Sequence, residues 1–98
     1  MKILQAISSS GERWTGRLQR KERSLREKGT TLYRDSKHKW KHTSYPGWIA
    51  WEEPVSGMLV ARIQTHAEGQ EWQILNAFLG YLNRHFGKDI ESIQIYYR

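Results

Sequence analysis

The sequence predicts an α+β fold, a two-layer sandwich in which two helices cover one face of a mixed, mostly antiparallel sheet. Three observations lead to this fold class. A long segment near the C-terminus repeats apolar residues every three or four positions, as amphipathic helices do. Short apolar or alternating segments, separated by turn signals, indicate strands on both sides of it. The chain has 98 residues, so residues 1–98 are expected to form a single domain with one core.

The first two elements are a strand and a helix. Residues 3–7 form a short apolar run that ends at three serines and a glycine, which predicts a buried strand. A helix is expected next, because Ser9 and Glu12 have the spacing of a capping box and Gly29 stands where a helix-terminating glycine belongs. Its narrow apolar stripe consists of Trp14, Leu18 and Leu25. We therefore expect few apolar contacts to hold this helix.

Three strands are predicted in the middle of the chain. Residues 30–42 alternate and indicate one strand, in which Trp40 shares a face with two histidines and the lysines lie on the other face. Residues 48–52 and 58–65 indicate two more, separated from their neighbours by turn signals at residues 45–47 and 54–57. These strands are expected to form an antiparallel meander. Glu52 and Glu53 are adjacent on a strand and point to opposite faces, so we interpret them as charges flanking a turn.

The clearest element is a helix that begins near a second capping-box spacing, Thr65 and Glu68, and ends before Gly87. Its apolar positions cover about half of the helix surface. They are Trp72, Ile74, Leu75, Phe78, Leu79, Tyr81, Leu82 and Phe86. Residues 90–97 alternate and predict a last strand, which gives the order β-α-β-β-β-α-β. The first and last strands can pair at the centre of the sheet.

Positive charge is concentrated in one part of the chain. The basic segment, residues 11–42, has eleven of the sixteen Lys and Arg residues and four acidic residues, a net charge of +7. The sheet and long-helix segment, residues 43–98, carries a net charge of −2. A localised excess of this kind is typical of proteins that contact an anionic polymer.

The basic helix and the basic strand together favour a small nucleic-acid-binding module, with DNA or RNA as the partner. Lys and Arg side chains can contact phosphates, and flat rings can stack on exposed bases. The candidate nucleic-acid-binding residues are Arg13, Arg17, Arg20, Lys21, Tyr33, Lys37, Lys39, Trp40 and Lys41. We expect the site to lie where the cations of the helix approach the lysines of the strand.

Two other classes of function remain open. A small, toxin-like, metal-independent RNase needs only side chains such as His, Lys, Arg and Tyr near a scissile phosphate. His38 and His42 are the candidate catalytic residues for that alternative. An interaction protein could instead dock an acidic partner on its basic surface. No catalytic residue is otherwise assigned. A metal site is not expected, because residues four apart on a strand are roughly 13 Å apart.

Several other features are absent from the sequence. It has no cysteine, which excludes disulfides and thiolate metal sites, and no P-loop or dinucleotide-binding motif, so no cofactor is expected. It has no membrane span and no signal-peptide core, so we expect a soluble, cytoplasmic protein. The wide apolar arc of the long helix could leave part of the segment from Trp72 to Phe86 free to form a homodimer.

Overall fold

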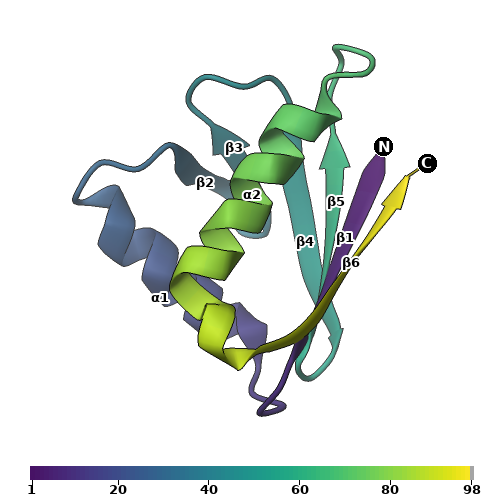
Figure 1. Cartoon of the computed structure of the whole chain (residues 1–98). Coiled ribbons are helices and arrows are strands. Elements are labelled where there is room, and N and C mark those ends of the chain that lie inside the picture. The colour runs from purple at the N-terminus through teal and green to yellow at the C-terminus, as the bar shows by residue number, and fades with distance from the viewer. Residues whose placement is uncertain (98) are drawn as a thin grey trace.

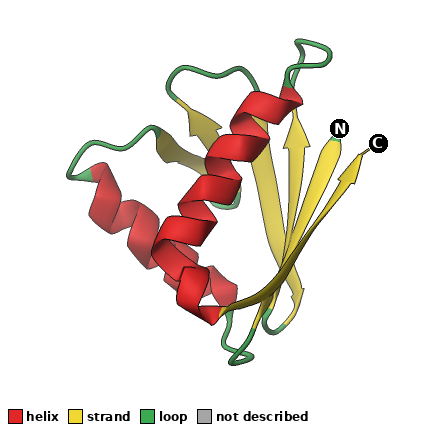
Figure 2. Cartoon of the chain, viewed as in Figure 1, coloured by secondary structure: helices red, strands yellow, loops and turns green. Residues whose placement is uncertain are grey.

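The structure is a computed structural model that describes residues 1–97. It contains a six-stranded antiparallel sheet with strand order β2-β3-β4-β5-β1-β6 and two helices, α1 and α2, on one face (Figure 1). Colouring by secondary structure separates the helical layer from the sheet, and the other face of the sheet is left open (Figure 2). The predicted α+β two-layer sandwich is therefore confirmed.

The elements follow one another as β-α-β-β-β-β-α-β. Their bounds are β1 (Lys2–Ser8), α1 (Trp14–Arg26), β2 (Leu32–Ser36), β3 (Lys39–His42), β4 (Trp48–Val55), β5 (Met58–Gln64), α2 (Glu71–Phe86), the 3₁₀ turn η1 (Gly87–Asp89) and β6 (Ile90–Tyr97). The first and last strands pair as predicted, but β6 lies at the edge of the sheet and not at its centre.

The prediction of one strand over residues 30–42 is wrong. This segment is the hairpin β2–β3, in which Leu32 pairs with His42 and Ser36 pairs with Lys39. Residues 34–39 contain no Gly or Pro and are all polar, so Asp35 and Ser36 are the only turn-favouring residues that mark the break. Every pairing between the described strands is antiparallel, whereas a mixed, mostly antiparallel sheet was expected.

Neither predicted capping box begins a helix. Helix α1 begins at Trp14, after Arg13, which makes no capping hydrogen bond of its own. Helix α2 begins at Glu71, and the hydroxyl of Thr65 instead accepts a hydrogen bond from the backbone N–H of Ala67 in the loop before the helix. Both capping boxes were predicted from residue spacing alone. The tertiary contacts of the loops that contain them outweigh this local preference.

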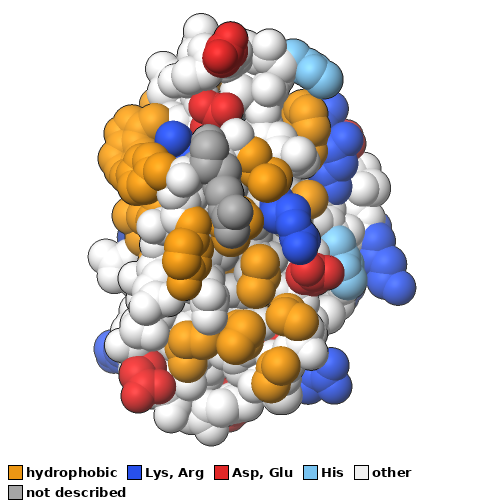
Figure 3. All heavy atoms as spheres, turned by 90° about the vertical axis from the view of Figure 1, so that its right-hand side faces the viewer, with side chains coloured by type: hydrophobic (Ala, Val, Ile, Leu, Met, Phe, Trp, Pro, Cys, Tyr) orange, Lys and Arg blue, Asp and Glu red, His pale blue; other side chains and the backbone are white. Residues whose placement is uncertain are grey.

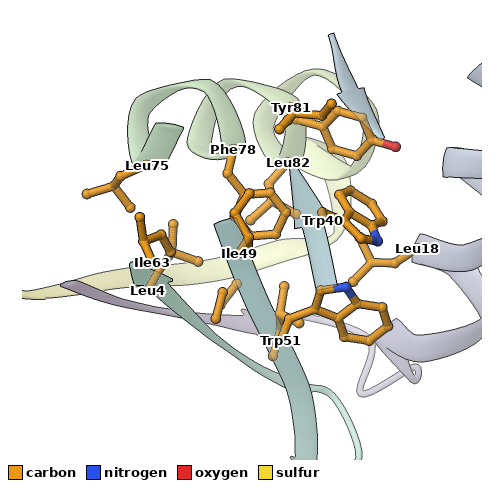
Figure 4. Close-up of a cluster of buried hydrophobic side chains, with 14 of the residues drawn as sticks. Leu4, Leu18, Trp40, Ile49, Trp51, Ile63, Leu75, Phe78, Tyr81 and Leu82 are labelled. Carbon is orange, nitrogen blue, oxygen red and sulfur yellow. The ribbon is translucent and has the colours of Figure 1, made fainter. Parts of the chain in front are cut away.

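The core lies between the helices and the sheet, and Trp40 of β3 is one of its largest buried side chains (Figure 4). Its ring makes edge contacts with Tyr81 and Phe78 of α2, at centroid distances of 5.3 and 5.9 Å, and with Trp51 of β4 at 6.2 Å. Because Trp40 points toward the helices, its neighbours Lys39 and Lys41 must lie on the open face of the sheet.

Most of the apolar arc of α2 belongs to this core. Ile74, Leu75, Phe78, Tyr81 and Leu82 are at most 2% exposed, while Trp72 is 46% exposed near the start of the helix. The arc is thus filled by contacts within one chain, and the homodimer through α2 stays a prediction that rests on Trp72. No helix within residues 1–97 is long and apolar enough to cross a membrane.

Candidate functional site

The predicted nucleic-acid-binding residues lie on two opposite faces of the domain. Helix α1 packs on the same face of the sheet as Trp40, through the buried side chains of Trp14 and Leu18. The lysines of β3 are on the other face, where Lys39 pairs across the sheet with Ala50 and Lys41 pairs with Trp48. The expected approach of the α1 cations to the lysines of the strand therefore does not occur.

Trp40 cannot serve as a stacking residue. It is 1% exposed and surrounded by aromatic side chains of the core. Its assignment to the binding surface was wrong. A tryptophan between lysines on a strand can point either to solvent or to the core, and the sequence does not distinguish the two directions. In this hairpin the buried face is the one that Trp40 and Leu32 share.

Arg17 is held in a structural network. Its Nη1 lies 2.6 Å from Oδ2 of Asp89, its Nε donates a hydrogen bond to the carbonyl oxygen of Arg13, and its guanidinium lies 4.9 Å from the ring centre of Trp14. Hydrogen bonds from Ser10 and Ser8, together with those from Arg17 and Ser9, hold the pKa of Asp89 well below its usual range. The charge of Arg17 is thus compensated within the fold.

Glu53 is the residue that caps α1. Its side chain is 2% exposed, and one carboxylate oxygen accepts hydrogen bonds from the N–H groups of Trp14 and Gly57, at 2.7 and 2.8 Å. The other oxygen accepts from the N–H and the hydroxyl of Thr15, at 3.1 and 2.7 Å. Burial alone would raise the pKa of Glu53, but these hydrogen bonds outweigh it and the pKa is lowered. Arg13, whose Nε is 3.8 Å from this carboxylate, keeps a 73% exposed side chain.

Four cations lie together on the helical layer, where α1 meets the C-terminal end of α2. We name Arg20 and Lys21 of α1, Arg84 of α2 and Lys88 of η1 the helix-face cluster. Within residues 1–97 none of the four forms an ion pair. They line two adjoining hollows of about 540 and 260 Å³ at the junction of the two helices, which share Arg17 and Phe86 as walls.

His85 lies near cations of both helices. It lies on α2 with its ring 4.7 Å from that of Tyr81. Burial lowers the pKa of His85, and the positive charges of Lys21 and Arg84 lower it further. Lys21 belongs to α1 and Arg84 to α2, so both helices contribute positive charge to the same place.

The open face of the sheet carries a second group of the predicted residues. Tyr33 of β2, Lys41 of β3 and Trp48 of β4 are direct neighbours across three strands. Lys41 is 3.8 Å from Asp35, and both side chains are 39% exposed, so this pair contributes little. Lys37 is exposed in the turn between β2 and β3.

The other half of the open face is apolar. Figure 3 views the molecule from the side of β1 and β6, and hydrophobic side chains gather over its middle and lower parts. By register, Ile3 and Ile7 of β1 lie beside Arg62 and Met58 of β5 on this face. The open face is thus divided into an apolar half and an aromatic and cationic half.

His38 and His42 each have a local structural contact. The ring of His38 stacks on that of Trp51, with centroids 4.6 Å apart. Nδ1 of His42 accepts hydrogen bonds from the N–H groups of Ser44 and Tyr45, and burial lowers the pKa of His42. Both residues shape the ends of β3, and the RNase alternative gains no specific support from their geometry.

Arg84 and Lys88 were missed by reasoning from the sequence, as were Trp48 and the capping role of Glu53. No local signal identifies them, because their positions in the site follow from how distant segments come together in the fold. Among residues 1–97, no three His, Asp or Glu side chains lie close enough together to hold a metal ion.

No family model matches the chain, and neither curated proteins nor solved structures include a significant match.

Proposed function

We propose that this protein binds DNA or RNA, and that the helix-face cluster contacts the phosphates. The observation that carries the proposal is the convergence of Arg20, Lys21, Arg84 and Lys88 at the junction of two helices, with no carboxylate paired to any of them in the described chain. Unpaired cations at one place raise the local concentration of a polyanion, whereas paired ones do not.

The charges of the neighbouring acids support this assignment. Asp89 lines the larger hollow, but its carboxylate is already compensated by Arg17 and by hydrogen bonds from the three serines at the end of β1 and just after it. Glu22 of α1 is 1% exposed and accepts hydrogen bonds from Arg26 and from the backbone N–H of Arg34. Neither acid offsets the four free cations, so the junction keeps a net positive charge.

The test is a salt series with the double variant Arg20→Gln/Arg84→Gln. Each substitution removes one charge without removing a buried contact, because both arginines are exposed. The side chain of Arg20 lies over Gly16, and that of Arg84 lies over Gly80. On duplex DNA the slope of log K against log salt should fall in magnitude by about 1.8, about 0.9 for each lost phosphate contact. Fluorescence anisotropy of a labelled duplex at several salt concentrations measures the slope.

A charge-matched control separates a site from a diffuse field. Lys2→Gln/Arg62→Gln also removes two charges, on the sheet and away from the helix junction. It should leave the slope within the error of the measurement. Equal losses in the two double variants would show that only the net charge matters, and retention of full affinity by Arg20→Gln/Arg84→Gln would refute the proposal.

A further inference from the structure

A hollow of about 650 Å³ lies on the cationic half of the open face. Its walls are β3, the turn between β3 and β4, the start of β4 and the loop before α2. The residues that give it chemical character are Lys39, Lys41, Tyr45, Trp48 and His66. Its volume is within the range of about 300–1,000 Å³ that is usual for small-molecule sites.

The indole of Trp48 is fixed in this hollow by three neighbours. Its Nε1 donates a hydrogen bond to the side-chain oxygen of Gln64 at 3.1 Å. Nζ of Lys39 lies 5.1 Å from the ring centre, and the ring of His66 lies 5.0 Å away at an angle of 52°. A ring held in this way loses little conformational freedom when a ligand stacks on it.

A second ring stands at the rim. Tyr45 is 40% exposed and stacks on His42, with centroids 4.3 Å apart and an interplanar angle of 16°. The turn that carries it is fixed by the backbone N–H groups of Ser44 and Tyr45, which donate to Nδ1 of His42. The hollow therefore presents two anchored aromatic rings beside two lysines.

Gly47 places this turn against the sheet. Its φ of +106° is in the region that favours glycine, and a Cβ at this position would overlap the carbonyl oxygen of Gln64. The wall of the hollow is thus packed directly on β5, which indicates that the hollow exists before any ligand arrives.

We propose that this hollow binds a nucleobase together with its phosphate, the base stacking on Trp48 and Tyr45 and the phosphate contacting Lys39 or Lys41. Aromatic faces accept any base, and lysine contacts a phosphate as a point charge. The base can come from a free nucleotide or from an unpaired position in a single strand, since both offer the same chemistry. None of the residues that line this hollow belongs to the helix-face cluster, although Arg84 lines a neighbouring hollow together with His42 and Tyr45.

The test is an NMR titration of the ¹⁵N-labelled protein with adenosine 5′-monophosphate, adenosine, orthophosphate and a single-stranded oligothymidine. We expect the monophosphate to shift the indole resonance of Trp48 and the amide of Gly47, with no change at Arg20 or Arg84. Tighter binding of the oligonucleotide than of the monophosphate would identify a single strand as the source, and the reverse would identify a free nucleotide. Equal shifts from orthophosphate and from the monophosphate, or no shifts from the monophosphate and the oligonucleotide, would overturn the proposal.

Variants make the assignment specific. Trp48→Ala should weaken binding of the monophosphate by about 5- to 150-fold, the range for loss of one base–aromatic stack. Trp72→Ala, at the exposed tryptophan of α2, is the matched control and should leave binding unchanged. If Trp48→Ala does not fold, Lys39→Gln/Lys41→Gln replaces it, and this variant should weaken binding of the monophosphate but not of adenosine. Loss of the same size in Trp48→Ala and Trp72→Ala would contradict the site.

The two proposals can fail separately. Arg20→Gln/Arg84→Gln tests phosphate contacts on the helical layer and should keep its affinity for the monophosphate. Binding of the monophosphate without binding of duplex would support the nucleotide hollow and refute the phosphate contacts of the helix-face cluster. Binding of duplex without binding of the monophosphate would support the cluster and refute the hollow.

Discussion

Replacing Glu53 by glutamine should remove the cap of α1 and lower the stability of the domain substantially. In the native protein this carboxylate accepts four hydrogen bonds, two at each oxygen, from Trp14, Thr15 and Gly57. A glutamine keeps one acceptor oxygen and turns an NH₂ group toward the donors at the other. Two hydrogen bonds to a charged acceptor are then lost in a side chain that is 2% exposed.

The size of the effect follows from these contacts. A hydrogen bond to a charged group contributes about 1.5–3 kcal/mol, and the loss of a helix cap costs about 1 kcal/mol. The contributions overlap, because the bonds to Trp14 and Thr15 are themselves the cap. We therefore expect the free energy of unfolding of Glu53→Gln to be about 2–4 kcal/mol lower than that of the native protein, out of a total of about 5–15 kcal/mol for a domain.

Urea unfolding followed by circular dichroism measures this difference, and pH provides a second criterion. The pKa of Glu53 is lower in the folded protein than the value of about 4.3 expected in the unfolded chain. Its stabilisation is therefore present above that unfolded value and is lost as the pH falls through the folded pKa. The difference between Glu53→Gln and the native protein should accordingly shrink in acid.

The adjacent carboxylate is the control. Glu52 is 50% exposed and lies 2.9 Å from Arg62, an exposed ion pair that contributes about 0–1 kcal/mol. Glu52→Gln should thus change stability little, and with no comparable dependence on pH from this source. If both variants lose the same stability at neutral pH, or if the loss in Glu53→Gln persists undiminished in acid, the capping role of Glu53 is refuted.

Two further predictions concern the core and the turn that holds the hollow. Tyr81 is 2% exposed and its hydroxyl has no hydrogen-bond partner within the described residues, so Tyr81→Phe should leave the free energy of unfolding unchanged or raise it by about 1–3 kcal/mol. A loss of more than about 1 kcal/mol in urea unfolding would reveal an unseen partner. Gly47→Ala should destabilise the domain by more than Gly29→Ala, because both positions have positive φ but only the Cβ at position 47 meets backbone, that of Gln64. Thermal unfolding of the two variants compares them, and equal losses would show that the contact relaxes freely.

The sequence could predict the elements whose signal is local. The apolar positions of α2 recur at helical spacing, and Ile74, Leu75, Phe78 and Leu82 are fully buried. The stripe of α1 was also found, since Trp14 and Leu18 are fully buried and Leu25 packs partly against the core. In both cases the period of the pattern is a property of a single element, and one sequence is enough to read it.

The sequence could not predict contacts between elements. Glu53 is 39 residues from Trp14, and nothing near either residue marks them as partners. The split of the basic residues between two faces follows from the direction of Trp40, because the faces of a strand alternate. The pattern gave that alternation correctly, but it could not say which face the helices would cover, and so the α1 cations and the β3 lysines were expected to meet.

Because the apolar stripe of α1 is narrow, polar contacts also hold this helix in place. Glu53 binds its N-terminus, Arg17 ties its first turns to Asp89, and Glu22 joins its last turns to the backbone of Arg34. Each link joins α1 to a different segment, so the three together fix its position as well as its ends. The basic segment therefore supplies two kinds of cation. Arg17 and Arg26 pair with Asp89 and Glu22, the acids of two of these links, whereas Arg20 and Lys21 form no ion pair within residues 1–97.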